Sequence, residues 1–271
     1  MTRRSVFRVV PCLITLSLAL TLCLALAAAA LYPQANGSVV LTDNGTTMDA
    51  SHADQGYVMI KHKSSSKALK LRIMMGDSTY TYDLASDGQF ETFPLTFGSG
   101  DYIISVFQQV SGKRYTNDSS LKLSVQLADE TLPYLYPNQY AWYTSDSKAV
   151  QKGVEICQGL TSAAQKVEAV RKFVSSTITY DYMLAATVKS GYLPSVDQVL
   201  SSGKGICFDY AVLTTCMLRS QGVPTKLAIG WADTIYHAWN YVLVDGNWLL
   251  IDTTADANHM NVTKYTEERI Y

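Results

Sequence analysis

A cysteine in the second half of the sequence has surroundings that suit a nucleophile. Cys207 follows the glycine-containing segment 203–206. It opens a long apolar stretch, ended by Gly222, in which the charged residues are Asp209 and Arg219. This stretch predicts a buried helix, because a helix without a polar face has no side to turn to water. The partial positive charge at a helix start favours a thiolate over a thiol. A small buried hydrophobic residue is the alternative interpretation of Cys207.

A predicted β-hairpin downstream supplies a histidine and a carboxylate. Two strand-like segments flank Asp245-Gly246, a dipeptide typical of two-residue hairpin turns. With that turn, His237 and Asp252 lie on one face of the hairpin as diagonal neighbours, about 7–8 Å apart. A three-residue turn would place Asp252 on the opposite face. Cys207, His237 and Asp252 can therefore be arranged as nucleophile, base and orienting carboxylate.

Metal binding is the other chemistry that these residue types allow. One cysteine, one histidine and one aspartate could ligate zinc, but the sequence has no Cys-x-x-Cys pair and no second histidine close to His237. It also has no EF-hand calcium loop. We therefore predict no metal and no other cofactor.

Helices are expected on the N-terminal side of the cysteine. Asp146 is a candidate cap for a helix that runs to about residue 160. Ser162 with Gln165, and Ser195 with Gln198, fit the capping-box pattern that begins a helix. Apolar residues follow Ser162 at helical spacing.

Residues 32–130 read instead as a series of short strands. Segments 69–73 and 121–125 alternate apolar and polar residues, and 56–61 and 102–107 are apolar runs. A further strand is expected over 79–82, and clusters of Gly, Asp and Ser separate these segments. The pattern predicts a β-sandwich, with an Ig-like sandwich as the favoured type. We find no cluster of chemically active residues here, so a spacer or binding module is the expected role.

The N-terminus predicts export. Arg3, Arg4 and Arg8 precede an uncharged run from Val9 to Leu31 that contains four consecutive alanines. A cleaved signal peptide fits these features, and the run is also long enough to be an uncleaved membrane anchor. Both interpretations place the rest of the chain outside the cytoplasm, either secreted or attached through residues 9–31. The predicted division of the chain is 1–30, signal or anchor; 32–130, sandwich; 131–271, catalytic domain.

Charge and cysteine content narrow the possibilities further. The chain has 23 acidic and 22 basic residues, a net charge of −1, so it lacks the basic surface of a nucleic-acid-binding protein. The exported part keeps Cys157, Cys207 and Cys216, too few for a disulfide scaffold. Cys216 is expected in the core, and a disulfide between Cys157 and Cys216 stays open.

Four sequence blocks around the three reactive residues occur in the order, and with the gaps, of a known family. The blocks are Gly205–Ala211, Leu218–Pro224, His237–Asn240 and Trp248–Thr254. Over about residues 160–256 the chain resembles the transglutaminase-like superfamily of papain-like cysteine enzymes.

The resemblance implies an α+β fold, in which helices of a papain-like core pack on an antiparallel sheet, here preceded by the sandwich. It implies a catalytic triad of Cys207, His237 and Asp252 that transfers acyl groups through a thioester. Thr253 stands where the family usually has proline. The side chain that would stabilise the oxyanion is not placed, and the Cys207 backbone N–H is the candidate donor.

Two functions follow as hypotheses. The favoured one is an extracytoplasmic cysteine enzyme that acts on amide bonds of a protein or peptide, with cell-wall peptide among the candidates. Hydrolysis, as a peptidase or amidase, is favoured over crosslinking. The alternative is a catalytically silent cell-surface or cell-wall binding protein whose ligand binds residues 32–130. The oligomeric state is not predicted.

Overall fold

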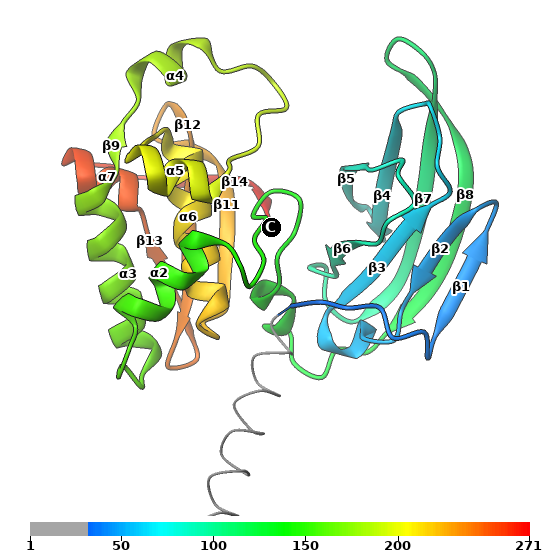
Figure 1. Cartoon of the computed structure of the whole chain (residues 1–271), viewed down its shortest axis with the longest axis horizontal. Helices are drawn as coiled ribbons and strands as arrows, with labels where there is room; N and C mark the ends of the chain where they lie inside the picture. Colours follow the sequence, from blue (N-terminus) through cyan, green and yellow to red (C-terminus); the bar gives the residue numbers. More distant parts are fainter. Residues whose placement is uncertain (1–31) are drawn as a thin grey trace, which may run out of the picture.

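The computed structural model describes residues 32–271 (Figure 1). The predicted signal or anchor at residues 1–30 lies outside the described residues. Within 32–271, no helix is long and apolar enough to cross a membrane.

Two four-stranded antiparallel sheets form the N-terminal part, and they share one buried apolar core. The chain changes sheet after β3, after β5 and again after β6, so neighbours in sequence often lie in different sheets. The first sheet has the order β1 (Val40–Asp43), β2 (Thr46–Asp49), β3 (Tyr57–His62), β6 (Glu91–Pro94). The second has the order β5 (Ser78–Leu84), β4 (Leu69–Met75), β7 (Gly100–Ser111), β8 (Arg114–Val125).

The five predicted strands are all present, as β3, β4, β5, β7 and β8. In β4, Leu69, Leu71 and Ile73 are buried while Arg72 is exposed, which is the alternation that predicted the strand. The sequence did not predict β1, β2 or β6. The Ig-like type remains a prediction, as does the domain boundary at residue 130, which falls between β8 and the 3₁₀ turn η2 (Leu132–Leu135).

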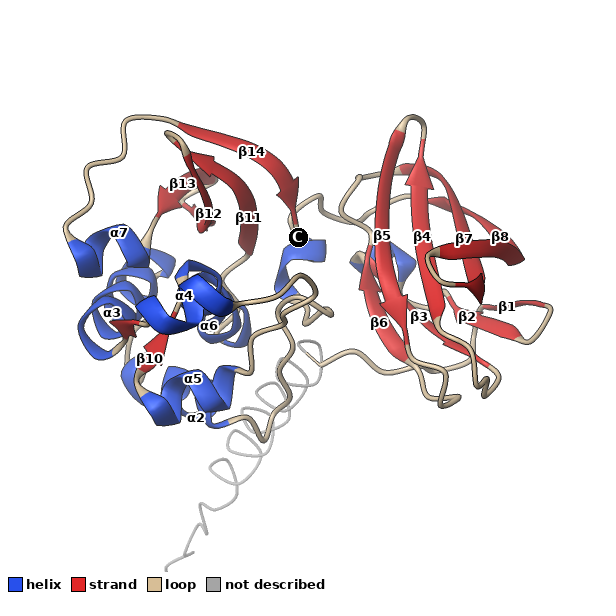
Figure 2. Cartoon of the chain, turned by 90° about the horizontal axis from the view of Figure 1, so that it is seen from above, coloured by secondary structure: helices blue, strands red, loops and turns tan. Residues whose placement is uncertain are grey.

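The C-terminal part packs helices against a third antiparallel sheet, which confirms the predicted α+β class (Figure 2). The sheet has the order β13 (Asn247–Ile251), β12 (Ile235–Val244), β11 (Thr225–Ala232), β14 (Tyr265–Ile270). The longer helices are α2 (Lys148–Ile156), α3 (Ala163–Thr177), α5 (Val196–Ser202) and α6 (Cys207–Ser220). The short elements of this part are β9 (Thr179–Tyr180), α4 (Tyr182–Thr187), β10 (Lys204–Gly205) and α7 (Thr253–Asn258). The N-terminal part has one 3₁₀ turn between β2 and β3, η1 (Ala53–Gln55).

Helix α6 is the centre of this part, as its apolar sequence predicts. Every residue from Asp209 to Ser220 is buried, and α6 contacts α2, α3, α5, β11 and β12. The helix ends in a Schellman motif: Val223 N–H donates to the Leu218 carbonyl and Gly222 N–H donates to the Arg219 carbonyl, both at 3.0 Å. Gly222 has φ +76°, the left-handed conformation that this motif requires.

The other helix starts were predicted with mixed success. Ser162 and Gln165 form the predicted capping box at the start of α3. Asp146 is not a cap, because α2 begins after Ser147, and α2 ends at Ile156 rather than near residue 160. Ser195 is the N-cap residue of α5, yet its hydroxyl makes no capping hydrogen bond, so that capping box is absent.

Arg219 joins α6 to the connection between the two parts. Its guanidinium is fully buried and donates to three backbone carbonyls, those of Thr225 at 2.8 Å, Tyr136 at 2.6 Å and Tyr271 at 2.8 Å. Burial lowers the pKa of Arg219, since a low-dielectric interior disfavours the charged form. The carbonyl oxygens offset that cost.

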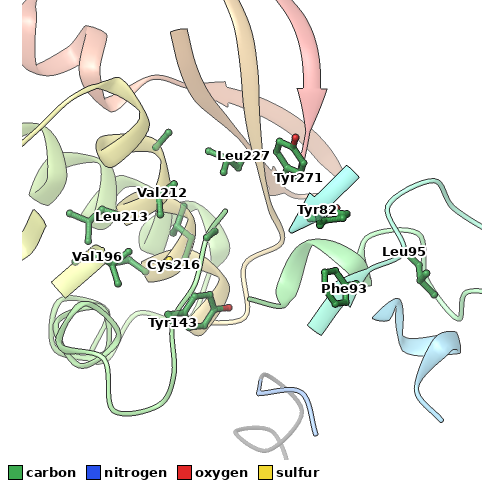
Figure 3. Packing of buried hydrophobic residues seen from close by; sticks show 14 of the residues in the cluster. Tyr82, Phe93, Leu95, Tyr143, Val196, Val212, Leu213, Cys216, Leu227 and Tyr271 are labelled. Atoms are coloured by element: carbon green, nitrogen blue, oxygen red, sulfur yellow. The ribbon is translucent and has the colours of Figure 1, made fainter. Parts of the chain in front are cut away.

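Aromatic side chains fill the contact between the sandwich and the C-terminal part. Tyr271 packs against Tyr140, with 4.0 Å between ring centroids, and against Tyr80 at 5.2 Å and Tyr82 at 6.2 Å. Figure 3 shows Tyr271 beside Leu227 on one side and Tyr82 on the other. One continuous apolar core therefore runs through both parts.

Replacing Arg219 tests this connection. Arg219→Met should lower the free energy of unfolding by about 2 kcal/mol or more, because the buried carbonyls of Thr225 and Tyr136 lose their donor at about 1–3 kcal/mol each. The Tyr271 oxygen keeps a second donor, the Leu227 N–H at 2.9 Å. The matched control is Arg114→Met on the exposed β7–β8 hairpin, where a change below about 0.5 kcal/mol is expected. Urea unfolding followed by circular dichroism measures both. Equal effects of the two substitutions would contradict the role of Arg219.

Candidate active site

Cys207 is the first residue of α6, where the sequence placed it. Its side chain is partly exposed and carries a free thiol. Asp209 Oδ2 accepts the Ile206 N–H at 2.8 Å and so fixes the first turn of the helix. Gly205 lets the chain pass close to this carboxylate, because a Cβ at position 205 would lie 2.5 Å from Asp209 Cβ.

The β12–β13 hairpin has the predicted register. Val244 pairs with Asn247 across a two-residue turn, in which Asp245 and Gly246 have φ angles of +49° and +77°. His237 Nε2 lies 2.7 Å from Asp252 Oδ2. The structure thus places these two side chains in direct contact, closer than the diagonal spacing alone requires.

Asp252 does more than end a strand. Strand β13 stops at Ile251, and Asp252 is the N-cap of α7, a helix that the sequence did not predict. Asp252 Oδ1 accepts the backbone N–H groups of Thr254 at 3.0 Å and Ala255 at 2.9 Å. Thr253 takes the first helical position, where proline is also favoured, so the departure from the family pattern keeps the cap.

A tyrosine from β14 completes the surroundings of this carboxylate. The Tyr265 hydroxyl donates to Asp252 Oδ2 at 2.9 Å, beside the bond from His237. Sequence reasoning missed Tyr265, because it belongs to an edge strand that gave no clear strand pattern. Its contact depends on the pairing of β14 with β11, which spans a long stretch of chain.

The contact between His237 and Asp252 raises the pKa of the imidazole and lowers the pKa of the carboxyl group. Burial disfavours charged His237, but hydrogen bonds with Asp252 and Cys207 and their negative charges prevail and raise the pKa of His237 to about 9. Burial likewise opposes charged Asp252, but the bonds from His237, Ala255 and Tyr265 lower its pKa. The proton of the pair therefore belongs to the imidazole.

The imidazole has one nitrogen for each neighbour. Nε2 is committed to Asp252, which leaves Nδ1 for another partner, and the Cys207 side chain lines the same cavity as His237. The structure therefore brings together the three residues that the sequence singled out. Their catalytic roles remain predictions.

A cavity of about 610 Å³ opens over Cys207 and His237. The segment after α4 forms one wall, and it is fixed by a bond from the Tyr192 hydroxyl to Asp209 Oδ1 at 2.7 Å. Asp209 is 1% exposed, so this bond anchors the wall to the first turn of α6. The sequence did not indicate Tyr192, because the bond joins it to a residue 17 positions away.

Tyr180 is a second cavity residue that the sequence missed. It lies in β9, which pairs in parallel with β10 so that Tyr180 is opposite Gly205. Burial and the negative charge of Cys207 raise the pKa of Tyr180. Its phenol therefore stays a hydrogen-bond donor near the nucleophile candidate.

The remaining thiols lie elsewhere. Cys157 and Cys216 are buried, and both are free in the described part of the chain. Burial raises the pKa of each thiol, which keeps them protonated. The residues from 32 onward contain no group of three or more His, Cys, Asp or Glu side chains that could hold a metal ion.

The pH dependence of stability tests the His237–Asp252 pair. The folded pKa of His237, about 9, lies above its ordinary 6.5, so the charged imidazole stabilises the fold. That contribution is fully present below pH 6.5 and is lost as pH rises through about 9. The difference in unfolding free energy between the wild type and His237→Gln should shrink by about 3 kcal/mol over this interval. Urea unfolding measures it, and a constant difference would contradict the raised pKa.

The segment that carries these residues is similar to known proteins. The family model described as Transglutaminase-like superfamily matches residues 150–253. A curated relative, the UPF0252 protein MJ1282 of Methanocaldococcus jannaschii, is 29% identical over 98 residues. That segment covers 32% of this chain and 28% of the relative, so the match spans less than a third of the relative's length.

Solved structures show a more distant likeness. A candidate cysteine protease of Cytophaga hutchinsonii has 16% identity and a TM-score of 0.41, covering 73% of this chain and 74% of that one. A red sea bream transglutaminase has 12% identity and a TM-score of 0.30, covering 73% and 48%. Both TM-scores are low, so neither likeness bears on the reaction.

The family match includes all three residues that the structure brings together. Cys207, His237 and Asp252 each lie within its limits, on the helix and hairpin described above. Residues 150–253 therefore form a domain of the transglutaminase-like superfamily.

Proposed function

We propose that the protein is an extracytoplasmic cysteine enzyme that cleaves amide bonds by acyl transfer, with Cys207, His237 and Asp252 as its catalytic residues. One observation carries the proposal: a partly exposed thiol at a helix start shares a cavity with an imidazole that a buried carboxylate holds at 2.7 Å. Catalytic triads with a thiol nucleophile need this arrangement.

The reaction has two halves. The Cys207 sulfur attacks the amide carbonyl carbon, and the carbon–nitrogen bond breaks as His237 gives its proton to the leaving amine. A thioester remains on Cys207. His237 then takes a proton from water, the resulting hydroxide attacks the thioester, and the carbon–sulfur bond breaks to release the thiolate and a carboxylic acid, which gives its proton to the solvent. Asp252 keeps the imidazole oriented throughout.

Two donors would stabilise the negative oxygen that forms in each half. The Cys207 backbone N–H lies in the first turn of α6, where N–H groups have no partner within the helix. Tyr180 lines the same cavity and keeps its phenolic proton. We assign Tyr180 as the side-chain donor that the sequence left open.

Water is the acceptor in this proposal. The cavity walls include exposed residues such as Lys189 and Arg269, so solvent reaches the thioester. Peptides or proteins outside the cytoplasm, cell-wall peptide included, are the proposed substrates. The location depends on the sequence of residues 1–31. A crosslinking reaction would use the same first half and differ in the acceptor.

Removal of the nucleophile is the direct test. Wild-type protein should release p-nitrophenol from p-nitrophenyl acetate in a burst equal to the enzyme concentration, and mass spectrometry should find the acetyl group on Cys207. Cys207→Ala should abolish both, while the buried-thiol control Cys157→Ala keeps them. Adding an amine acceptor separates hydrolysis from transamidation. A wild type that forms no acyl-enzyme would favour the catalytically silent binding protein.

Tyr180 has its own test. Tyr180→Phe should lower acyl-enzyme formation by roughly 10- to 100-fold, at or just below the usual cost of one oxyanion donor. Alkylation of Cys207 by iodoacetamide should stay within about twofold, because alkylation forms no oxyanion. Tyr182→Phe is the matched control: it is 74% exposed and its ring lies 5.0 Å from that of Tyr180. Equal acylation by both variants would remove Tyr180 from the mechanism.

A further inference from the structure

The catalytic cavity is also lined by residues that lie far from Cys207, His237 and Asp252 in the sequence or in other elements of the fold. Lys70 of β4 and Asp83 of β5 reach it from the sandwich. Arg269 of β14 and Lys189 of the segment after α4 reach it from the C-terminal part. The sandwich is thus a wall of the cavity as well as a neighbouring domain.

The charges on these walls do not cancel. The Lys70 ammonium forms an ion pair with Asp83, and Asp83 is the one acidic residue among those that line the cavity. Lys189 and Arg269 form no salt bridge with any carboxylate among residues 32–271. Glu268, the neighbour of Arg269, accepts the Trp231 Nε1–H at 2.7 Å and does not line the cavity. Two unpaired cations therefore face the catalytic cavity.

Hydrogen bonds hold the two segments of the chain that carry Lys189 and Arg269. Beside Arg269, the Ile270 N–H donates to the Tyr80 hydroxyl at 3.2 Å, and Arg269 itself contacts the Tyr271 side chain. The Tyr192 bond to Asp209 fixes the segment that carries Lys189. Cations without a carboxylate partner that line the same cavity as a reactive centre are typical of a site that binds an anionic group.

We propose that the cavity selects substrates that carry a carboxylate beside the scissile amide, with Lys189 and Arg269 as the residues that bind it. This inference rests on the proposed function, because it names the substrate class of the same cavity. A carboxylate in this position has two sources, the terminal carboxylate of a peptide or an acidic side chain. Both bring one negative charge into the cavity that the two cations line.

Two small alkylating reagents test the charge selection without a known substrate. Iodoacetate and iodoacetamide have nearly the same shape and differ by one negative charge. In each, the Cys207 sulfur displaces iodide. The ratio of their alkylation rates on the 271-residue chain, divided by the same ratio for glutathione, measures the preference for an anion. We expect the wild-type value to exceed 1, and to fall towards 1 at about 1 M NaCl, where charges beyond about 3 Å are screened.

Charge-removing variants assign the preference to the two residues. Lys189→Gln and Arg269→Gln should each lower the ratio by about threefold, and the double variant by about tenfold. The matched control, Lys113→Gln with Arg114→Gln, removes the same charge from the β7–β8 hairpin and should leave the ratio unchanged. A ratio that stays constant in the cavity variants, or falls equally in the control, would overturn the proposal.

Matched chloroacetyl peptides distinguish the two carboxylate sources. Chloroacetyl-Gly-Gly is compared with its C-terminal amide, and chloroacetyl-Asp-amide with chloroacetyl-Asn-amide. The pair that loses its rate difference in the double variant identifies the source, and no difference in either pair would overturn the proposal.

The iodoacetamide rate alone reports on the proposed function. A Cys207 thiol that the neutral reagent alkylates quickly, with no charge preference, would contradict only the substrate class. A Cys207 thiol that neither reagent alkylates would contradict the proposed function itself.

Discussion

The structure depends on a constraint at helix α6, which has no face in contact with water. A charged side chain on such a helix must find its partners inside the protein, because an unpaired buried charge costs several kcal/mol. The two charged residues of α6, Asp209 and Arg219, are 1% and 0% exposed. Asp209 lies near the N-terminus and Arg219 near the C-terminus, where the helix dipole favours each sign.

The hydrogen-bond partners of these two charged side chains include residues that line the cavity. Asp209 holds the first turn through Ile206 and the outer segment through Tyr192. Arg219 holds the carbonyl of Tyr271, whose ring packs against the sandwich. Since the same helix begins with Cys207, one buried element positions both the nucleophile candidate and the walls on either side of it. The contacts that satisfy the buried charges of α6 therefore also position residues that line the cavity.

The sequence predicted those features that depend on nearby residues. The hairpin register followed from Asp245-Gly246, and the buried helix followed from its apolar composition. Long-range pairing was not predictable in the same way: β14 and Tyr265 reach Asp252 only because β14 pairs with β11. The Tyr192–Asp209 hydrogen bond joins two separate segments of the chain, and the cavity lining includes Lys70 and Asp83 of the sandwich. No local sequence pattern predicts contacts of this kind. The sequence therefore predicted that Cys207, His237 and Asp252 lie together, but it did not predict their surroundings.

The environment of Asp252 explains why the His237 imidazole keeps its proton. The carboxylate accepts four hydrogen bonds, two from the start of α7 and one each from His237 and Tyr265. Each of these bonds favours the charged form of Asp252, so the carboxylate does not take the imidazole proton. Because Asp252 is also the N-cap of α7, the start of this helix and the orientation of His237 are both stabilised by one side chain. Asp252 is thus a structural residue and an electrostatic one at the same time.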